Sequence, residues 1–377
     1  MIIILLIIFT AILLNYLTFL VGISKGIKNV SKQVVDKSEK EFISVIIPFR
    51  NEESNILACL KSITSQDYPI NNYEVIYIDD NSEDNSLELL EMHSKPDNIK
   101  LLRSEFDLAD RAHKKKALKF AIENSKGDII ITTDADCIHG KSWLKIMSEQ
   151  FDENTAFVSG PVEFTSDGSL FSELQKIEFS SLIIVGAGLI GINNPIICNA
   201  ANLGFRKSVF NEVGGYEDNL NLSSGDDEFL MQKIFRLTDY KIKFCLNSDA
   251  ISHTNPNKTL NEFYQQRKRW ASKGFHYVDN NIVFKLILIF LFYLSIPIQL
   301  LLGIFFDSVF LILFIINLLL KIGFEFKIVQ IDSQRLFRKA KNFHFLLAEF
   351  LHIPYIIISG ISGIFGNYKW KGREIKR

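Results

Sequence analysis

The stretch that decides the fold class is Asp128-Ile129-Ile130-Ile131-Thr132-Thr133-Asp134-Ala135-Asp136. Its three consecutive isoleucines are apolar on both faces, which is typical of a parallel strand covered by helices on both sides. Acidic side chains follow at once, at the end of the strand where open α/β sheets bind their ligands. The stretch therefore predicts an α/β domain with a polar site at one edge of its sheet.

Short apolar runs alternate with amphipathic stretches on both sides of this strand, between about Glu41 and Tyr277. The alternation predicts strands joined by helices. The run Val45-Ile46-Ile47, for example, is again apolar on both faces. The predicted strands are residues 42–48, 73–79, 99–103 and 128–133, and the predicted helices are residues 54–64, 86–93 and 114–125.

The first 22 residues contain no charged side chain, and they are long enough to cross about 30 Å of hydrocarbon. They predict a membrane anchor rather than a cleaved signal peptide, which would have a basic start and a small-residue cleavage site. Positive charge after a span places the next domain in the cytosol. We therefore expect an anchor at residues 1–22 and a cytosolic domain at residues 41–277, because four lysines follow the anchor: Lys25, Lys28, Lys32 and Lys37.

The C-terminal part contains two further apolar runs, residues 283–306 and 308–324, separated by Asp307. They predict a transmembrane hairpin at residues 283–324. Residues 325–377 hold a basic loop, an apolar segment at 343–366 and a basic tail. If that segment crossed the membrane, the tail would lie on the wrong side for the positive-inside rule, so we expect a re-entrant or interfacial hairpin broken at Pro354.

Charge and cysteine usage exclude some classes of function. The chain has 42 basic and 43 acidic residues and a formal net charge of −1, so no field of the whole chain favours nucleic acid. Its four cysteines lie far apart without a C-x-x-C spacing, which argues against a zinc site or a disulfide framework. They fit a cytosolic body with reduced thiols.

Polar side chains follow the first two predicted strands. The first strand leads into Pro48-Phe49-Arg50-Asn51-Glu52-Glu53, and the second leads into Asp79-Asp80-Asn81-Ser82. Carboxylates at these positions could accept hydrogen bonds from a uracil N–H or from ribose hydroxyls. The same residue types also favour turns and helix N-caps, so both interpretations stay open.

Two acids and a basic run could bind a diphosphate. Asp134 and Asp136 lie one residue apart, so both carboxylates can reach one Mg²⁺ or Mn²⁺ that bridges a diphosphate. Ordinary loop acids also give D-x-D pairs, but the strand before this one favours a metal site. The run His113-Lys114-Lys115-Lys116 begins a helix, where cations oppose the macrodipole and a bound anion would offset the repulsion. A solvated lysine face is the alternative.

Two later motifs could act on a sugar acceptor. Gly225-Asp226-Asp227-Glu228 precedes a helical run, and one of its carboxylates could remove the proton of an acceptor hydroxyl. The acids could equally complement the helix dipole. Gln265-Gln266-Arg267-Lys268-Arg269-Trp270 lies just before the predicted hairpin, where Trp270 and the cations could instead anchor the chain at the lipid interface.

Taken in order, these motifs resemble the family 2 inverting glycosyltransferases of GT-A fold, the group that contains cellulose, chitin and hyaluronan synthases. The resemblance covers roughly residues 44–274. It implies that Asp227 is the catalytic base and that Asp134 and Asp136 form the metal motif. The donor and nucleotide positions that it implies are Pro48, Asn51, Glu52, Asp79, Asp80, Lys114 and Asp134. The acceptor-side positions that it implies are Asn202, Asp226, Gln265, Gln266, Arg269 and Trp270.

The resemblance implies a membrane-bound enzyme of hexosyltransferase type. It would transfer a sugar, with inversion and with Mg²⁺ or Mn²⁺, from a nucleotide-diphospho-sugar to a lipid-linked or glycan hydroxyl at the cytosolic face of the inner cell membrane. A UDP-sugar is the expected donor. The chain has fewer C-terminal spans than the long-chain synthases and lacks their threonine-glutamate pair before Asp226-Asp227, which disfavours processive synthesis.

Two other functions remain open from sequence alone. A nucleotidyltransferase or phosphotransferase could use the D-x-D pair and the basic helix start, but it would not explain residues 265–270. A catalytically silent membrane scaffold of the same fold is disfavoured because the D-x-D carboxylates and Asp227 are all present.

Overall fold

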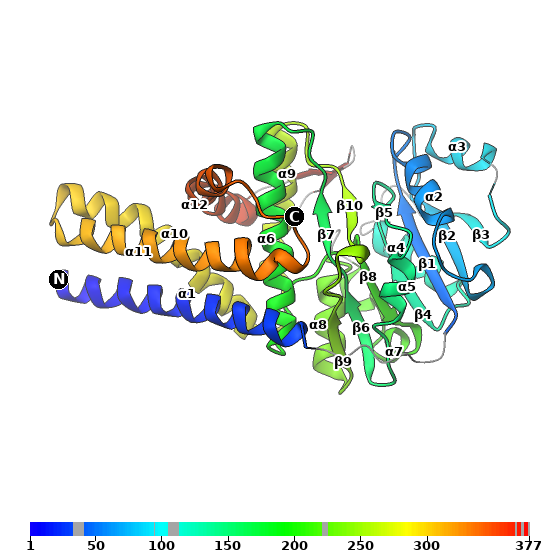
Figure 1. Cartoon of the computed structure of the whole chain (residues 1–377), viewed down its shortest axis with the longest axis horizontal. Coiled ribbons are helices and arrows are strands. Elements are labelled where there is room, and N and C mark those ends of the chain that lie inside the picture. Colours follow the sequence, from blue (N-terminus) through cyan, green and yellow to red (C-terminus); the bar gives the residue numbers. More distant parts are fainter. Residues whose placement is uncertain are drawn as a thin grey trace.

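The computed structural model describes residues 1–32, 41–93, 95–104, 113–220, 225–365, 368–370 and 373–375. Lys37 and the last two residues of the basic tail lie outside these ranges. Two parts are evident in Figure 1: a mixed α/β unit, and a group of long helices that project from one side of it.

A seven-stranded sheet forms the centre of the α/β unit, in the order β3-β2-β1-β4-β8-β6-β9. The first four of these strands in the chain are parallel, and β8 runs antiparallel to both of its neighbours. All four predicted strands are confirmed to within a residue or two. The strands are β1 Ile43–Phe49, β2 Tyr73–Asp79, β3 Ile99–Arg103, β4 Ile129–Thr132, β6 Thr155–Ser159, β8 Leu203–Arg206 and β9 Lys241–Phe244.

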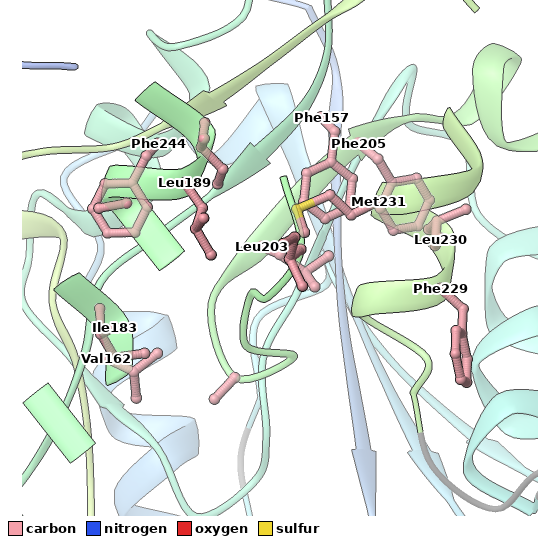
Figure 2. Packing of buried hydrophobic residues seen from close by; sticks show 14 of the residues in the cluster. Phe157, Val162, Ile183, Leu189, Leu203, Phe205, Phe229, Leu230, Met231 and Phe244 are labelled. Carbon is pink, nitrogen blue, oxygen red and sulfur yellow. The ribbon is translucent and has the colours of Figure 1, made fainter. Parts of the chain in front are cut away.

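Helices cover both faces of this sheet, as the doubly apolar strands predict. In β1, Val45 and Ile47 face the side chains of α2, whereas Ile46 faces α4, because successive side chains of a strand point to opposite faces. On the α4 side the core continues through Phe157, Phe205 and their neighbours (Figure 2). The helices of this unit are α2 Ile56–Thr64, α3 Ser86–Met92, α4 His113–Glu123, α5 Trp143–Ser148, α7 Lys207–Glu212 and α8 Glu228–Leu237.

A second, three-stranded sheet lies beside the first, in the order β5-β10-β7. His139 joins it to the main sheet, since its two ring nitrogens lie 3.1 Å from Thr133 Oγ1 and 3.0 Å from Ser252 Oγ. Burial lowers the pKa of His139 to about 3, so the ring is neutral at pH 7. The strands are β5 Ile138–His139, β7 Val162–Phe164 and β10 Ser252–Thr254, and helix α9 Leu260–Ala271 follows.

Three apolar helices project together from the α/β unit (Figure 1): α1 Ile2–Val30, α10 Asn280–Phe305 and α11 Val309–Phe326. Each is long and apolar enough to cross a membrane, and each exposes large apolar side chains, such as Ile3, Leu301 and Leu319. The predicted apolar segments are therefore helical. The helix at the N-terminus continues eight residues beyond the predicted anchor, to Val30. This apolar surface supports association with a membrane.

Helix α6 Leu170–Gly191, which the sequence did not reveal, separates the projecting helices from the sheet (Figure 1). It crosses α1 in close contact, since a Cβ atom at Gly26 would lie 1.8 Å from the carbonyl oxygen of Gly188. Asn29 Nδ2 also donates a hydrogen bond to the Gly191 carbonyl, at 3.0 Å. Glycines therefore allow the two backbones to touch.

Helix α12 Asn342–Phe365 corrects one prediction, because it continues without a break through Pro354. A proline removes one hydrogen bond of a helix, and here the packing of α12 against α6, α9 and α10 keeps the helix intact. In Figure 1 α12 is seen nearly end-on and crosses the direction of the three projecting helices. The described part of the chain ends in two short antiparallel strands, β11 Tyr368–Trp370 and β12 Arg373–Ile375.

Candidate functional site

A cleft of about 540 Å³ opens beyond the ends of β1 and β4, and this volume is in the usual range for ligand sites. It brings together segments from the whole α/β unit. Eleven of the residues that the resemblance implies line this one cleft: Pro48, Asp80, Lys114, Asp134, Asp136, Asp226, Asp227, Gln265, Gln266, Arg269 and Trp270. The D-x-D pair and Asp227, which are about 90 residues apart in the sequence, therefore face a common space.

A hydrogen bond connects the loops that follow β1 and β2, and further hydrogen bonds order each loop. Asn51 adopts φ +52°, and its side chain accepts a hydrogen bond from the Glu83 amide at 2.8 Å. The Asp79 carboxylate accepts one from the Ser82 amide at 3.0 Å, and the Glu52 carboxylate accepts one from Asn55 at 2.8 Å. Asn51, Glu52 and Asp79 do not line the cleft, so they shape the loops next to Pro48, near the end of β1, and Asp80, just after β2, which do line it.

Lys114 lines the cleft and lies between two carboxylates. Its Nζ atom is 2.8 Å from Asp134 Oδ1 and 3.3 Å from Asp226 Oδ2. Burial acts to lower the pKa of Lys114, but the Asp134 and Asp226 carboxylates outweigh it and raise that pKa well above its usual value. Burial acts to raise the pKa of Asp226, and Lys114 outweighs it in the same way and lowers that pKa. The cleft therefore holds a fixed positive charge at pH 7.

Lys115, the next residue, is buried at 1% exposure, with its ammonium group 5.3 Å from the centre of the Phe229 ring. Burial lowers its pKa to about 8, although the Asp226 and Asp227 carboxylates act in the opposite direction. At the start of α4, Lys114 is therefore ion-paired and Lys115 is buried, so these two residues do not form a solvated lysine face.

The D-x-D carboxylates fit a divalent ion. Asp134 is partly exposed to the cleft, and Asp136 Oδ2 accepts a hydrogen bond from Thr254 Oγ1 at 3.1 Å, which fixes that carboxylate. Within the described residues no cluster of three or more His, Cys, Asp or Glu side chains could hold a metal by itself. Mg²⁺ is commonly bound by one or two carboxylates together with phosphate and water oxygens, so a pair of acids beside a phosphate site is a suitable donor set.

Asp227 is held where an acceptor could reach it. It is the N-cap residue of α8: its Oδ1 atom accepts from the Glu228 amide at 2.8 Å, and its Oδ2 atom accepts from the Ala200 amide at 3.1 Å. Lys273 Nζ lies 3.7 Å from Asp227 and 3.0 Å from Glu228. Each carboxylate oxygen still has a second lone pair, so capping the helix and accepting a proton are compatible.

The turn that delivers these acids requires a glycine. Gly225 has φ +86°, in the left-handed region, and a Cβ atom there would lie 2.4 Å from the Phe229 ring. Only glycine adopts this conformation without strain. The turn directs Asp226 and Asp227 into the cleft.

Helix α9 forms the wall of the cleft that faces the projecting helices. It begins with a capping box, in which Thr259 and Glu262 satisfy each other's backbone amides. Gln265, Gln266, Arg269 and Trp270 line the cleft from it. Behind them, Arg267 is buried, pairs with Glu178 of α6, and lies 4.2 Å over the Trp270 ring. This pair fixes α9 against α6.

Asn202 is placed differently from the expectation. It is fully buried and does not line the cleft. Its Oδ1 atom accepts from Trp143 Nε1 at 3.0 Å, and its Nδ2 atom donates to the carbonyls of Pro161 and Ala250, both at 2.8 Å. All three hydrogen bonds are made within the protein, so Asn202 links the start of β8 to the segments that contain Trp143, Pro161 and Ala250.

Several lining residues were missed by the sequence reasoning. Thr254 is the last residue of the short strand β10, and Asn255 and Asn257 follow it. The polar cluster at the end of a strand could have indicated them. Lys273 lies two residues beyond the end of α9, outside the recognised motif, and no sequence signal singles it out.

Comparisons with known proteins agree with this geometry. Residues 44–214 match the sequence family described as Glycosyl transferase family 2. Glycosyltransferase AglE of Haloferax volcanii is 32% identical over 235 residues, which are 62% of this chain and 72% of that protein. The poly-beta-1,6-N-acetyl-D-glucosamine synthase of Staphylococcus epidermidis is 26% identical over 255 residues, 66% of this chain but only 58% of the synthase, so this chain covers less than two thirds of that relative.

Among solved structures, mannosyltransferase PcManGT from Pyrobaculum calidifontis superposes with a TM-score of 0.60 at 18% identity, over 96% of this chain and 99% of that one. At this identity the likeness establishes the fold, which is that of a GT-A glycosyltransferase. The sequence matches, together with the order of the cleft residues along the chain, establish the family as well as the fold. This chain belongs to the family 2 glycosyltransferases.

Proposed function

We propose that the protein transfers a sugar from a nucleotide-diphospho-sugar to a hydroxyl group of a lipid-linked or glycan acceptor, in a metal-dependent reaction that inverts the anomeric carbon. The observation that carries this proposal is that Asp136 and Asp227 line the same cleft, with Lys114 also at its wall. Residues proposed to bind the nucleotide, to hold the metal ion and to act as the base thus line one space. A UDP-sugar is the first donor to test.

Two relatives support the nature of the substrates. The structure of PcManGT is described as a complex with GDP-Man and Mn²⁺. A protein of Methanococcus voltae, 25% identical over 244 residues, is named dolichyl N-acetyl-alpha-D-glucosaminyl phosphate 3-beta-D-2,3-diacetamido-2,3-dideoxy-beta-D-glucuronosyltransferase. A nucleotide-sugar donor, a divalent ion and a lipid-linked acceptor are therefore all represented among proteins similar to this chain.

The proposed step is a single displacement. The acceptor oxygen attacks the anomeric carbon while the bond from that carbon to the diphosphate oxygen breaks, and the acceptor proton moves to Asp227. Lys114 and Arg269, which line the cleft, stabilise the negative charge that develops on the leaving diphosphate. When bound at Asp134 and Asp136, a Mg²⁺ or Mn²⁺ ion supplies further positive charge at this position. Because no covalent sugar intermediate forms, the anomeric configuration inverts.

We place the α/β domain, residues 41–277, on the cytosolic side of the inner cell membrane, with α1, α10 and α11 spanning the bilayer. Lys25 and Lys28 lie at the end of α1 nearest the α/β unit. Positive charges at that end favour its location in the cytosol. Helix α12, which crosses the direction of the spans, would lie at the membrane interface.

The test of this proposal replaces Asp227 by Asn. Asparagine is an equally good N-cap, so helix α8 should keep its start. Loss of a positioned base typically costs about 10² to 10⁴ in rate. We expect Asp227→Asn to release nucleoside diphosphate at least about a hundredfold more slowly, while Mn²⁺-dependent binding of the nucleotide persists. Asp218→Asn, an exposed acid paired with Lys233, is the matched control and should behave like the parent.

Three results would count against the proposal. Turnover of Asp227→Asn near the parent rate would remove Asp227 as the base. Release of pyrophosphate in place of a nucleoside diphosphate would indicate a nucleotidyltransferase. Absence of turnover with every nucleotide-sugar, in the parent and in the presence of Mn²⁺, would leave a membrane scaffold.

A further inference from the structure

A second cavity, of about 490 Å³, lies on the membrane side of the catalytic cleft. Its walls come from α1, α6, α10 and α12, four helices that are long and apolar enough to cross a membrane. Side chains such as Leu182, Val185, Leu286, Ile289 and Ile356 make most of the surface hydrocarbon. An aqueous substrate would gain nothing from such a surface, whereas an alkyl or isoprenoid chain would.

The two cavities meet at the candidate base. Asn199, Asp227, Trp270 and Lys273 line both of them. Asp227 is therefore approached by the polar cleft from one side and by the apolar cavity from the other. A molecule in the apolar cavity can present its end group to Asp227 without crossing the donor site.

One group of polar side chains at the apolar cavity is bonded internally. Tyr16 Oη donates to Glu325 at 2.6 Å and lies 3.0 Å from Tyr293 Oη, while Glu325 also pairs with Lys321 at 3.1 Å. Polar side chains in an apolar medium are stable only when they bond in this way. They leave a largely hydrocarbon wall for an occupant.

The cavity also communicates with the surface of the projecting helices. Ile287 lines it and is 41% exposed. Lys285, two residues earlier and exposed near the start of α10, lines it too, and its Nζ atom lies 3.3 Å from Asn194 Oδ1. The entrance is thus at the end of α10 nearest the α/β unit, where lipid head groups would meet the protein if α10 spans the bilayer.

We propose that this apolar cavity binds the tail of the acceptor, a membrane lipid whose head group presents a hydroxyl to Asp227. The inference rests on the proposed function and narrows its acceptor from lipid-linked or glycan to a lipid. The tail would enter at the start of α10, beside Lys285 and Asn194, and the head group would meet Asp227 beside Trp270.

The charges at the junction favour a hydroxyl head group over a phosphate. Asp227 and Glu228 are both there, and the nearby Lys273 is already within 3.0 Å of Glu228. A phosphate would face these carboxylates at close range. A phosphate oxygen is also largely ionised at pH 7 and needs no base, whereas a hydroxyl does. The base and the charge pattern therefore point to the same head group.

The experiment uses the full chain in nanodiscs, with dodecyl glucoside that carries a photoreactive diazirine in its alkyl chain. We expect cross-links to the lining residues of α6 and α10, and transfer of the donor sugar to dodecyl glucoside but not to farnesyl phosphate. Leu286→Trp fills the cavity near Gly274, whose Cβ position lies 3.5 Å from Leu286. It should lower cross-linking and transfer by about tenfold or more, because overfilling a packed site weakens binding.

Leu291→Trp is the matched control, since Leu291 is on the same helix, is exposed and does not line the cavity. Hydrolysis of the nucleotide-sugar by water should stay within about twofold of the parent in Leu291→Trp, because Leu291 lines neither the cavity nor the donor cleft.

Cross-links outside the cavity, or equal losses in Leu286→Trp and Leu291→Trp, would overturn the inference. Transfer to farnesyl phosphate alone would overturn the hydroxyl head group. Donor hydrolysis without cross-linking would refute the lipid site and leave the proposed function standing. Cross-linking without release of nucleoside diphosphate from any donor would refute the proposed function and, with it, the acceptor role of the cavity.

Discussion

Replacing Lys115 by Met should make the protein more stable, and the gain should depend on pH. Lys115 is 1% exposed, and burial lowers the pKa of its ammonium group from 10.5 to about 8. A lowering of that size corresponds to about 3 kcal/mol of unfavourable free energy for the charged form in the folded protein. Methionine has a similar length and no charge, so at pH 7 Lys115→Met removes this cost.

The direction of the pH dependence follows from proton binding. Between pH 8 and pH 10.5 the unfolded chain keeps the proton on Lys115 while the folded protein loses it, so the stability of the parent rises with pH. Below pH 8 both states carry the proton and the full cost is present. The advantage of Lys115→Met should therefore be largest at pH 7, should shrink from pH 8 upward, and should disappear above pH 10.5.

The assay is thermal unfolding in detergent, followed by tryptophan fluorescence at pH 7, 8.5 and 10. A difference of 1 to 3 kcal/mol corresponds to roughly 3 to 10 °C in Tm for a domain of this size. Lys116→Met, at the next and only partly buried position of α4, is the control and should change Tm little. A loss of stability in Lys115→Met at pH 7, or a gain that does not change with pH, would refute the reasoning.

Two further changes test the packing. Gly188→Leu should separate α6 from α1 and lower Tm strongly, because a Cβ atom at this position would lie 2.8 Å from the Ile23 carbonyl oxygen. Gly323→Leu is the control and should be tolerated, because no atom lies within 4 Å of its Cβ position. Equal Tm values for the two variants would contradict the close crossing of the helices. Asn202→Ala should lower the free energy of unfolding by about 2 to 5 kcal/mol, since three buried partners lose their hydrogen bonds. The folded fraction should still bind nucleotide normally in calorimetry. A selective loss of acceptor use with an unchanged Tm would instead assign Asn202 to the acceptor site.

The sequence predicted the parts of the molecule whose residues act locally. The strand before Asp134 is apolar on both faces because helices cover both faces of the sheet, and the D-x-D pair follows it because a strand end delivers side chains to the sheet edge. Asp227 and Trp270 were found through motifs. These features depend on neighbours in the sequence, so the sequence carries their signal.

What the sequence did not predict depends on tertiary packing. Asn202 looks like a loop residue of an acceptor site, but its amide is used entirely between β8 and its neighbours. The break expected at Pro354 is absent because contacts with α6, α9 and α10 hold α12 together. Lys273 lies in the cleft beyond the end of α9, where it pairs with Glu228 at the start of α8, far away in the sequence. None of these arrangements leaves a local pattern of residues.

The two carboxylates Asp136 and Asp227 line one cleft, and we assign Asp136 to the metal and Asp227 to the acceptor proton. The most direct test is the anomeric configuration of the transferred sugar, read by proton NMR from the coupling constant at the anomeric position of the product. A single displacement with Asp227 as base predicts a configuration opposite to that of the donor. A product with the donor's configuration would require a covalent intermediate or a different nucleophile, and would contradict the account.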